Sequence, residues 1–126
     1  MARYIRIQAG ALHMSAELNG SKTAQSIWEA LPINGIANCW GDEIYFGIPL
    51  KLEIEDGKEV VEIGDLAYWS PGHAFCIFFG PTPASQGDEV RPASAVSVFG
   101  KLIGDATQFK QVNSGNHVKI EKESDG

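Results

Sequence analysis

Six side chains between residues 45 and 91 have the chemistry of a ligand-binding site. They are Tyr45, Tyr68, Trp69, Phe78, Thr82 and Arg91. Tyr and Trp combine a large apolar ring with one polar atom, so they can form the wall of a cleft and still hydrogen-bond a ligand. Arg91 lies in a polar loop beside the aromatic stretch and could reach over such a cleft, although a solvated loop arginine is the plainer alternative. We expect these six residues to bind a small molecule or a short proline-containing peptide.

Strand alternation separates candidate wall residues from core residues. Tyr45 alternates with Ile44 and Phe46, so its side chain is expected to point away from the core that they share. A ring packed under a neighbouring loop is the structural alternative for Tyr45. Phe78 could belong in part to the core. Thr82 stands between two prolines, a pattern that fits a rigid rim of the cleft or an ordinary strand exit.

The sequence shows no catalytic or metal-ligating set. His13, His73 and His117 have no metal-ligand spacing to one another or to the cysteines, and we expect them at the surface. Cys39 and Cys76 lie among apolar residues, which predicts two buried, reduced thiols. No set of serine, histidine and acid stands out, and no glycine-rich phosphate loop opens a helix. We therefore assign no catalytic residue, no metal and no cofactor.

Length and composition describe one globular domain. The 126 residues predict a single domain over positions 1–126, with 44% hydrophobic and 21% charged residues. The formal net charge of −6 argues against nucleic acid or an anionic membrane as a partner, since phosphate binding needs clustered Lys and Arg. No run of residues is long and apolar enough to span a membrane or to act as a signal segment. We expect a cytoplasmic protein.

Alternating apolar and polar residues predict a chain built mostly of short strands. The expected strands cover residues 2–9, 12–18, 35–39, 43–48, 50–54, 60–63, 66–69, 74–79, 95–102 and 118–122. Turn chemistry separates several of them. Gly10-Ala11 fits a two-residue hairpin, Asp56-Gly57 predicts a second hairpin, and residues 70–73 fit a four-residue loop.

One helix is expected, over residues 21–31, where apolar residues recur at helical spacing. Ser21 or Thr23 can cap its first turn, and Pro32 ends it. Residues 105–112 predict one short helical turn. A single helix among many strands indicates a mainly β protein whose sheet is closed or nearly closed, with the helix over an open end.

Several motifs, taken in order along the chain, resemble the cyclophilins. They are Lys22-Thr23-Ala24 at the start of the helix, Gly64-Asp65, residues 98–102 and the closing strand at 118–120. Residues 40–46, 64–69 and 78–83 look more specifically like small prokaryotic cyclophilin-like proteins of uncharacterised function. This second resemblance covers nearly the whole chain. It implies a closed antiparallel β-barrel of about eight strands, capped by one clear helix and one short helix.

Activity follows less directly from the resemblance, because one fold serves many functions. Cyclophilins isomerise the bond before proline with an arginine beside a Phe-His on the strand after the first helix, and with a glutamine before a Gly-Gly-Asp. Here residues 35–46 contain no arginine or histidine, and Ile63 precedes Gly64-Asp65. We therefore expect a cyclophilin-like barrel that binds a ligand in an aromatic cleft without the usual isomerase arginine. An atypical peptidyl-prolyl isomerase is the alternative, and a subunit that forms a homodimer through exposed aromatic residues is a third.

Overall fold

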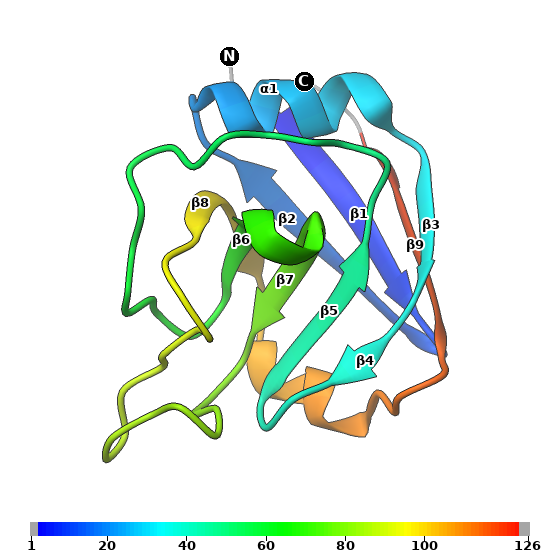
Figure 1. The fold of residues 1–126 in the computed structure, drawn as a ribbon. Coiled ribbons are helices and arrows are strands. Elements are labelled where there is room, and N and C mark those ends of the chain that lie inside the picture. Colours follow the sequence, from blue (N-terminus) through cyan, green and yellow to red (C-terminus); the bar gives the residue numbers. More distant parts are fainter. Residues whose placement is uncertain (1–2, 124–126) are drawn as a thin grey trace.

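An antiparallel sheet that nearly closes into a barrel organises residues 3–123, the part of the chain that the computed structural model describes (Figure 1). Its nine strands are β1 (Arg3–Ala9), β2 (Leu12–Leu18), β3 (Ile33–Ile36), β4 (Asn38–Cys39), β5 (Glu43–Gly47), β6 (Asp65–Trp69), β7 (Ala74–Phe78), β8 (Ser97–Ile103) and β9 (His117–Lys122). The order in the sheet is β3-β9-β1-β2-β8-β6-β7-β5-β4. The mainly β barrel expected from the sequence is thereby confirmed.

The N-terminal hairpin of β1 and β2 follows the local sequence pattern. Ala9 pairs with Leu12, and Gly10 occupies the first turn position with a φ of +57°, which favours glycine. Side chains alternate along β1: Ile5 and Ile7 are completely buried, whereas the residue between them is exposed. The predicted two-residue hairpin is therefore confirmed.

The two edges of the sheet, β3 and β4, are neighbours in sequence and are separated only by Ala37. β3 pairs with β9 and β4 pairs with β5, so one bent segment joins both edges and almost closes the barrel. The Ala37 amide donates to the carbonyl of Asn116 at 2.9 Å. A Cβ on Gly35 would lie 2.6 Å from Cδ2 of Phe46, so only glycine lets this ring pack against β3. The single strand expected over residues 35–39 is thus two strands.

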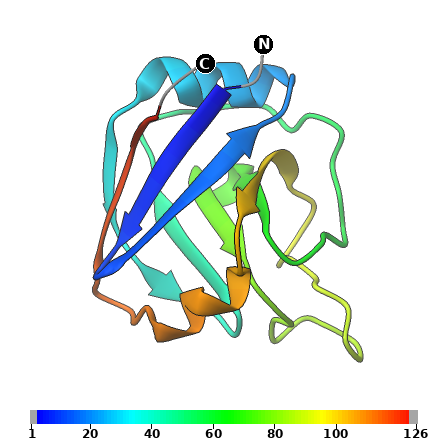
Figure 2. The same ribbon diagram turned by 180° about the vertical axis from the view of Figure 1, so that it is seen from behind.

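Helical segments cover the two ends of the barrel (Figures 1 and 2). The helix α1 (Lys22–Ala30) crosses one end, and the short 3₁₀ helix η2 (Ala106–Gln111) lies at the other. The helix expected over residues 21–31 and the helical turn expected over 105–112 are confirmed, with ends that differ by one residue. These helices bury apolar side chains that would otherwise face water at the open ends.

Amides in the first turn of α1 donate hydrogen bonds to two different segments of the chain. The Ser21 hydroxyl accepts from the Ala24 amide at 3.0 Å, which is the predicted cap. The Glu55 carboxylate accepts from the amides of Lys22 and Thr23 at 3.1 and 2.9 Å. A carboxylate at this position also complements the positive end of the helix dipole. A distant loop therefore anchors α1 to the barrel.

The hairpin predicted around Asp56-Gly57 is wrong. Residues 48–64, which we call the first loop, contain no strand and cross one face of the barrel (Figure 1). Two isolated bridges join this loop to residues 79–96, which we call the second loop. These bridges are Lys58 to Val96 and Val61 to Val90.

Side chains of the barrel, rather than a partner strand, bind the backbone of the first loop. The Tyr68 hydroxyl accepts from the Leu52 amide at 3.2 Å and donates to the Leu50 carbonyl at 2.7 Å. The Ser97 hydroxyl accepts from the Glu55 amide at 2.7 Å. Leu50 and Leu52 pack against the core from this loop. The alternation of apolar and polar residues in the first loop thus reflects partial burial of its side chains, and not pairing with another strand.

Buried apolar side chains form two groups on opposite sides of the sheet. The barrel core includes Phe75, whose ring stacks on Phe46 at 5.0 Å between centroids and meets Phe99 edge-on at 4.9 Å. A second group lies outside the barrel, under the two loops. This flank cluster consists of Val61, Ala67, Ala74, Cys76, Phe78, Val90 and Val96. Both faces of β6 and β7 are therefore buried.

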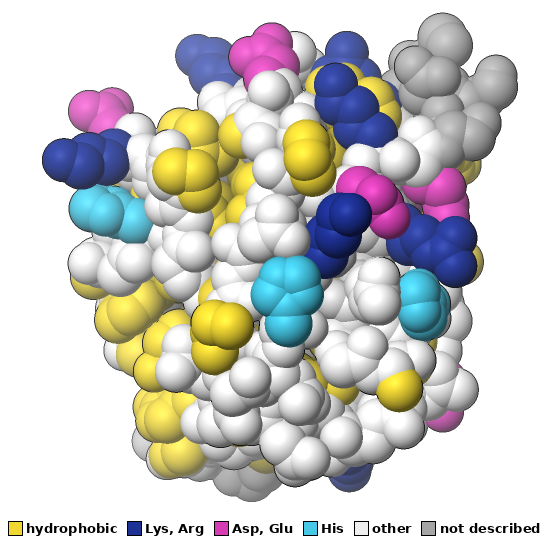
Figure 3. Space-filling model, turned by 90° about the vertical axis from the view of Figure 1, so that its right-hand side faces the viewer, with side chains coloured by type: hydrophobic (Ala, Val, Ile, Leu, Met, Phe, Trp, Pro, Cys, Tyr) yellow, Lys and Arg dark blue, Asp and Glu magenta, His cyan; other side chains and the backbone are white. Residues whose placement is uncertain are grey.

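Figure 3 views the barrel from the right-hand side of Figure 1. Charged side chains gather toward the α1 end of this face, and hydrophobic side chains gather along the edge that adjoins the face shown in Figure 1. Within residues 3–123, no helix is long and apolar enough to cross a membrane. In the same range, no group of three or more His, Cys, Asp and Glu side chains is placed to hold a metal ion.

Candidate functional site

A cavity of about 220 Å³ opens on the outer flank of the barrel, beside the flank cluster. It lies between the turn before β5, the outer faces of β5 and β6, and the second loop. Its lining residues are Trp40, Glu43, Tyr45, Trp69, Pro92, Ala93 and Val96. Three aromatic rings and one carboxyl group therefore share a small and mostly apolar space, which is the usual composition of a ligand site.

Strand alternation turns Glu43 and Tyr45 toward this flank cavity. Ile44 and Phe46 are 0% and 1% exposed and belong to the barrel core, so the odd-numbered residues of β5 face outward. The register of β5 with β7 places Tyr45 opposite Cys76, a member of the flank cluster. The outward position predicted for Tyr45 is confirmed.

A tight turn brings Trp40 next to Glu43. The Trp40 amide donates to the Glu43 carbonyl at 2.8 Å, and the Glu43 amide donates back to the Trp40 carbonyl at 3.2 Å. Gly41 has a φ of +60°, and a Cβ there would lie 2.7 Å from Cδ of Pro83. Glycine is therefore required both by the backbone conformation and by the close approach of the second loop.

The Trp69 ring, at the end of β6, is held in one orientation at the flank cavity. Its Nε1 donates to the Ser94 hydroxyl at 2.7 Å, which ties the ring to the second loop. On the other side lies the 3₁₀ turn η1 (Ser70–Gly72), where a Cβ on Gly72 would be only 2.8 Å from the indole ring. These contacts make Trp69 a rigid wall instead of a freely rotating side chain.

Glu43 is the buried ionisable residue of the flank cavity, with 5% of its surface exposed. Burial raises the pKa of its carboxyl group to about 7, and the neighbouring Cys76 thiol lowers the pKa by less. The pKa of Cys76 is raised well above its ordinary value, first by burial and then by the charge of Glu43. Within residues 3–123, no Lys, Arg or His forms an ion pair with Glu43. The carboxyl group is therefore divided between its charged and neutral forms near neutral pH.

A larger hollow of about 500 Å³ lies beside the N-terminal end of α1. Its lining includes Arg3, Lys22 and Gln25, and the Arg3 guanidinium already hydrogen-bonds the Gln25 side chain. None of the charged side chains in that lining is buried. The hollow beside α1 therefore lacks both aromatic walls and a buried polar group. The flank cavity has both, so we take the flank cavity as the candidate site.

Of the six residues predicted to bind a ligand, Tyr45 and Trp69 meet at the flank cavity, and Tyr68 and Phe78 do not line it. Tyr68 is 1% exposed and packs in the barrel core, with its hydroxyl bound to the first loop. Alternation along β6 turns it away from its neighbour Trp69. Phe78 is completely buried in the flank cluster, opposite Glu43 in the β5–β7 register.

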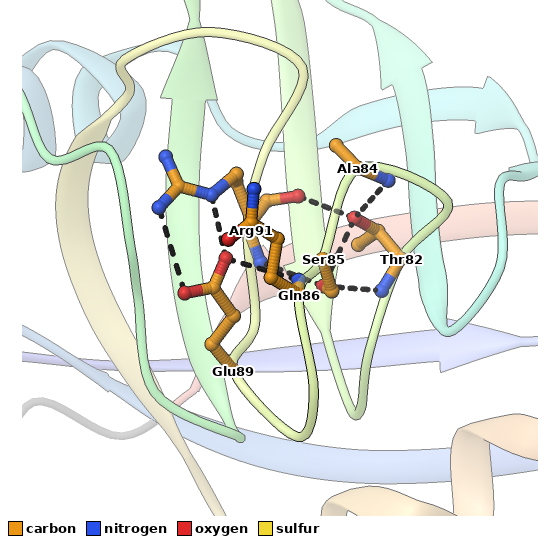
Figure 4. Close-up of polar contacts among 6 residues, drawn as sticks. All are labelled: Thr82, Ala84, Ser85, Gln86, Glu89 and Arg91. Atoms are coloured by element: carbon orange, nitrogen blue, oxygen red, sulfur yellow. Dashed lines mark hydrogen bonds and ion pairs between the residues drawn. The ribbon is translucent and has the colours of Figure 1, made fainter.

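Thr82 and Arg91 also lie away from the lining, because their polar groups bind within the second loop (Figure 4). The Thr82 hydroxyl donates to the Arg91 carbonyl, and the Thr82 amide donates to the Ser85 hydroxyl at 2.9 Å. The Arg91 guanidinium pairs with the Glu89 carboxylate at 2.6 Å. These two residues shape the loop that covers the flank.

Sequence reasoning missed five lining residues, which are Trp40, Glu43, Pro92, Ala93 and Val96. Glu43 carried a usable signal, because the alternation that turns Tyr45 outward turns Glu43 outward as well. Trp40 carried a weaker one, as a large aromatic residue next to a Gly-Asp turn. Residues 92–96 carried none, since their place depends on how the second loop folds over the barrel.

The predicted burial of Cys39 is wrong. Cys39 is exposed in the two-residue strand β4, and its Sγ lies 3.6 Å from the Val112 carbonyl. Because β4 is an edge of the sheet, its apolar sequence neighbours do not cover it. Cys76 is buried as predicted, and both thiols are free. The three histidines are exposed, as expected.

Comparison with known proteins identifies the class to which this barrel belongs. The family model described as Cyclophilin-like matches residues 3–121. The chain therefore belongs to the cyclophilin-like family. It is similar to the hypothetical protein AF2241 from Archaeoglobus fulgidus, whose solution structure shares 41% sequence identity and a TM-score of 0.81, over 97% of this chain and 95% of that one. The resemblance to small prokaryotic cyclophilin-like proteins is thereby confirmed.

A second similar structure is that of McbB in complex with tryptophan. It shares 14% sequence identity and a TM-score of 0.73, over 97% of this chain and 45% of McbB. At this level of identity the likeness shows the fold alone. A comparison with curated proteins gives no match.

Proposed function

We propose that this protein is a binding module whose flank cavity accepts one ring-sized group of a small molecule or short peptide. The observation that carries the proposal is the convergence of Trp40, Tyr45 and Trp69 with the buried Glu43 around one space of about 220 Å³. Sites for drug-sized ligands measure about 300–1,000 Å³, so this space suits one ring with a short substituent. Aromatic walls hold flat groups, and their polar tips orient them.

Tryptophan is a suitable first probe of this proposal. McbB, which shares the barrel fold, forms a complex with tryptophan. An indole ring matches the size of the flank cavity, and Trp and Tyr side chains stack well on indoles.

A peptidyl-prolyl isomerase is the alternative from a different class. The uncatalysed barrier is about 18–20 kcal/mol because the amide is conjugated, and a donor aimed at the proline nitrogen would weaken that conjugation. The described lining of the flank cavity contains no Arg, Lys or His, and Arg91 pairs with Glu89, which favours binding over this reaction. An assay on a proline tetrapeptide decides between them. Acceleration that disappears when the cavity is blocked would replace the binding proposal.

The cytoplasmic location expected from the sequence belongs to the same proposal, because the free thiols Cys39 and Cys76 fit a reducing compartment. The homodimer is the third alternative. Sedimentation at low concentration tests it, since a strict monomer would leave exposed aromatic residues without a second copy to bind.

The indole N–H signals of ¹⁵N-labelled protein provide a direct test of binding. The chain has three tryptophans. Trp40 and Trp69 line the flank cavity, whereas Trp28 lies on α1 under the charged groups of Arg3 and Lys122. On titration with tryptophan or a proline tetrapeptide, we expect the signals of Trp40 and Trp69 to shift and saturate. Trp28 is the internal control and should not move.

A blocking variant locates the binding. Ala93 is an exposed lining residue, so Ala93→Leu fills the flank cavity without entering the barrel core. We expect it to weaken binding of the probe by about tenfold or more, equivalent to about 1.4 kcal/mol. Ala11→Leu makes the same change in the exposed turn of the β1–β2 hairpin and should bind normally. Equal binding by both variants would place the ligand elsewhere.

A further inference from the structure

We propose that the flank cavity selects ligands that carry a protonated amine, which would lie among the aromatic walls and pair with the Glu43 carboxylate. This inference rests on the binding function proposed above and names the chemical class of its ligand. It assigns to Glu43 a recognition role that no other residue of the lining can supply.

Glu43 is isolated from the charged and polar groups that usually accompany a buried acid. It is 95% buried, which follows from its exposed fraction of 5%, and it lines the flank cavity. Among residues 3–123 it has no ion pair, and no backbone amide donates to its carboxylate; the Cys76 thiol lies near it and donates to the Ala74 carbonyl. Asp65, which is also a buried acid, accepts from the Glu62 amide at 2.9 Å and lies 3.7 Å from the Lys101 ammonium. A buried carboxylate without such partners costs free energy that a cationic ligand would recover.

The aromatic lining of the flank cavity also suits a cation. Ring faces attract cations, and ammonium groups are commonly bound among Trp and Tyr side chains. In this chain Arg3 and Lys122 approach the Trp28 ring at 5.2 and 5.0 Å. Within the described residues, no cation of the protein approaches the rings of Trp40 or Trp69 in this way. Those rings are therefore available to a cation from outside.

The charge around the flank cavity has the sign that attracts a cation. The lining contains Glu43 and no basic residue, and the whole chain carries a formal net charge of −6. Both features favour approach of a cation and disfavour an anion. A neutral ligand would gain only from the rings and from a hydrogen bond to the carboxyl group.

Among the described residues that line the flank cavity beside Glu43, none is Lys, Arg or His. Tyr45 lies beside it on β5, and Cys76 faces it from β7 with a pKa raised well above its ordinary value. In the preceding turn, Asp42 lies 4.0 Å from the Lys110 ammonium. β6 contributes Trp69, and the second loop contributes Pro92, Ala93 and Val96, none of which titrates.

The affinity for an amine should depend on pH through Glu43. Because the pKa of Glu43 is about 7 in the free protein, the carboxylate that pairs with an ammonium is depleted below that pH. The affinity for an amine should therefore fall by about tenfold between about pH 8 and pH 6, since the ionised fraction falls by that factor. A simple amine stays protonated over this range, so the titrating group is on the protein.

The test compares phenethylamine with phenethyl alcohol, which have the same ring and linker and differ in charge. Affinities are measured from the indole N–H signals of Trp40 and Trp69 at about pH 8 and pH 6. We expect the amine to bind about tenfold or more tightly than the alcohol at the higher pH, and to lose this advantage at the lower pH. Glu43→Gln should remove the advantage of the amine over the alcohol at both pH values. Glu53→Gln, an exposed change of the same charge, should have no effect.

The outcomes separate the two proposals. Equal affinity of amine and alcohol for the unmodified protein would overturn the amine inference and leave the binding function intact. Tighter alcohol binding at low pH would also overturn it, because Glu43 would then act as a neutral donor. Binding of neither probe, nor of tryptophan, would overturn both. If Glu43→Gln fails to fold, the pH dependence of amine and alcohol binding to the unmodified protein still tests the amine inference.

Discussion

At the scale of single residues, neighbours in the sequence have opposite surroundings. Tyr68 lies inside the barrel with its hydroxyl bound to the first loop, and Trp69 lies outside it at the flank cavity. The reason is the two-residue period of a strand, which sends successive side chains to opposite faces. In the same way Glu43 leaves the barrel core while Ile44 enters it. Residue type alone does not separate a wall residue from a core residue.

Removal of one buried hydroxyl tests this division. In Tyr68→Phe the Leu52 amide and the Leu50 carbonyl lose their partner, so the free energy of unfolding should fall by about 1–3 kcal/mol. Urea denaturation measures the change. Tyr45→Phe is the matched control, since the Tyr45 hydroxyl has no hydrogen bond within the described residues, and it should change stability by less than about 0.5 kcal/mol. Equal stability of both variants would show that the Tyr68 hydroxyl contributes nothing.

Glu43 should give the stability of the protein an unusual pH dependence. Its pKa is about 7 in the folded protein and 4.5 ordinarily, so between these values the folded state binds the proton more tightly. The contribution of Glu43 to the free energy of unfolding therefore falls by about 3 kcal/mol as the pH rises from about 4.5 to 7. Above that pH the contribution stays constant. Glu43→Gln should lack this decrease. Thermal or urea unfolding over the range checks it, and parallel profiles for the two proteins would contradict the raised pKa.

At the level of secondary-structure elements, the first loop makes hydrogen bonds of the kind that a partner strand or a helix cap usually makes. The first loop has no strand partner, yet its backbone binds the hydroxyls of Tyr68 and Ser97. Its Glu55 carboxylate in turn binds the first turn of α1. Because helix ends carry unsatisfied amides, a carboxylate there stabilises the helix and fixes it to the loop. The loop, α1 and β8 are thereby joined into one unit.

Glu55→Gln tests that link. The pKa of Glu55 is lowered, chiefly by the hydrogen bond from the Thr23 amide. A lowered pKa in the folded state means that the ionised group stabilises the protein above its ordinary pKa, and that this contribution is lost as pH falls through the folded value. The variant should melt at a lower temperature than the unmodified protein at pH 7, and the difference should disappear in acid. Glu53→Gln in the same loop is the control, and a difference that persists in acid would point to packing instead of charge.

At the scale of the whole molecule, the barrel has apolar residues on both faces of part of its wall. The core fills the interior, and the flank cluster lies between β6, β7 and the two loops. The loops do not cover all of the outer surface, and the flank cavity opens where their cover ends. Closure depends on a separate feature, the single bent segment that supplies both β3 and β4.

Gly35→Ala tests the closure. A Cβ there would meet the Phe46 ring at 2.6 Å, and that ring is 1% exposed and stacked on Phe75, so it has little room to move. Overpacking of this kind should lower the free energy of unfolding by about 1–3 kcal/mol. Gly47→Ala, where a Cβ would meet nothing within 4 Å, is the control and should be neutral or stabilising. Unfolding in urea compares the two. Similar values for both would show that the seam tolerates a wider separation of β3 and β5.

Most of the strands, the helix and the barrel class could be predicted from the sequence, because alternation, helical spacing and turn chemistry act between residues close together in the chain. The strands expected over residues 50–54 and 60–63 are the exceptions, since these residues form a loop. Gly10 in its hairpin and Ser21 at its cap are examples. That Trp69 shares the flank cavity with Trp40, whereas Tyr68, Phe78, Thr82 and Arg91 do not line it, depends on the three-dimensional fold. The physical reason is that β5 reaches β6 only through β7, and that the loop at residues 92–96 closes the site from far along the chain. Such long-range neighbours leave no periodic signal in the residues that they bring together.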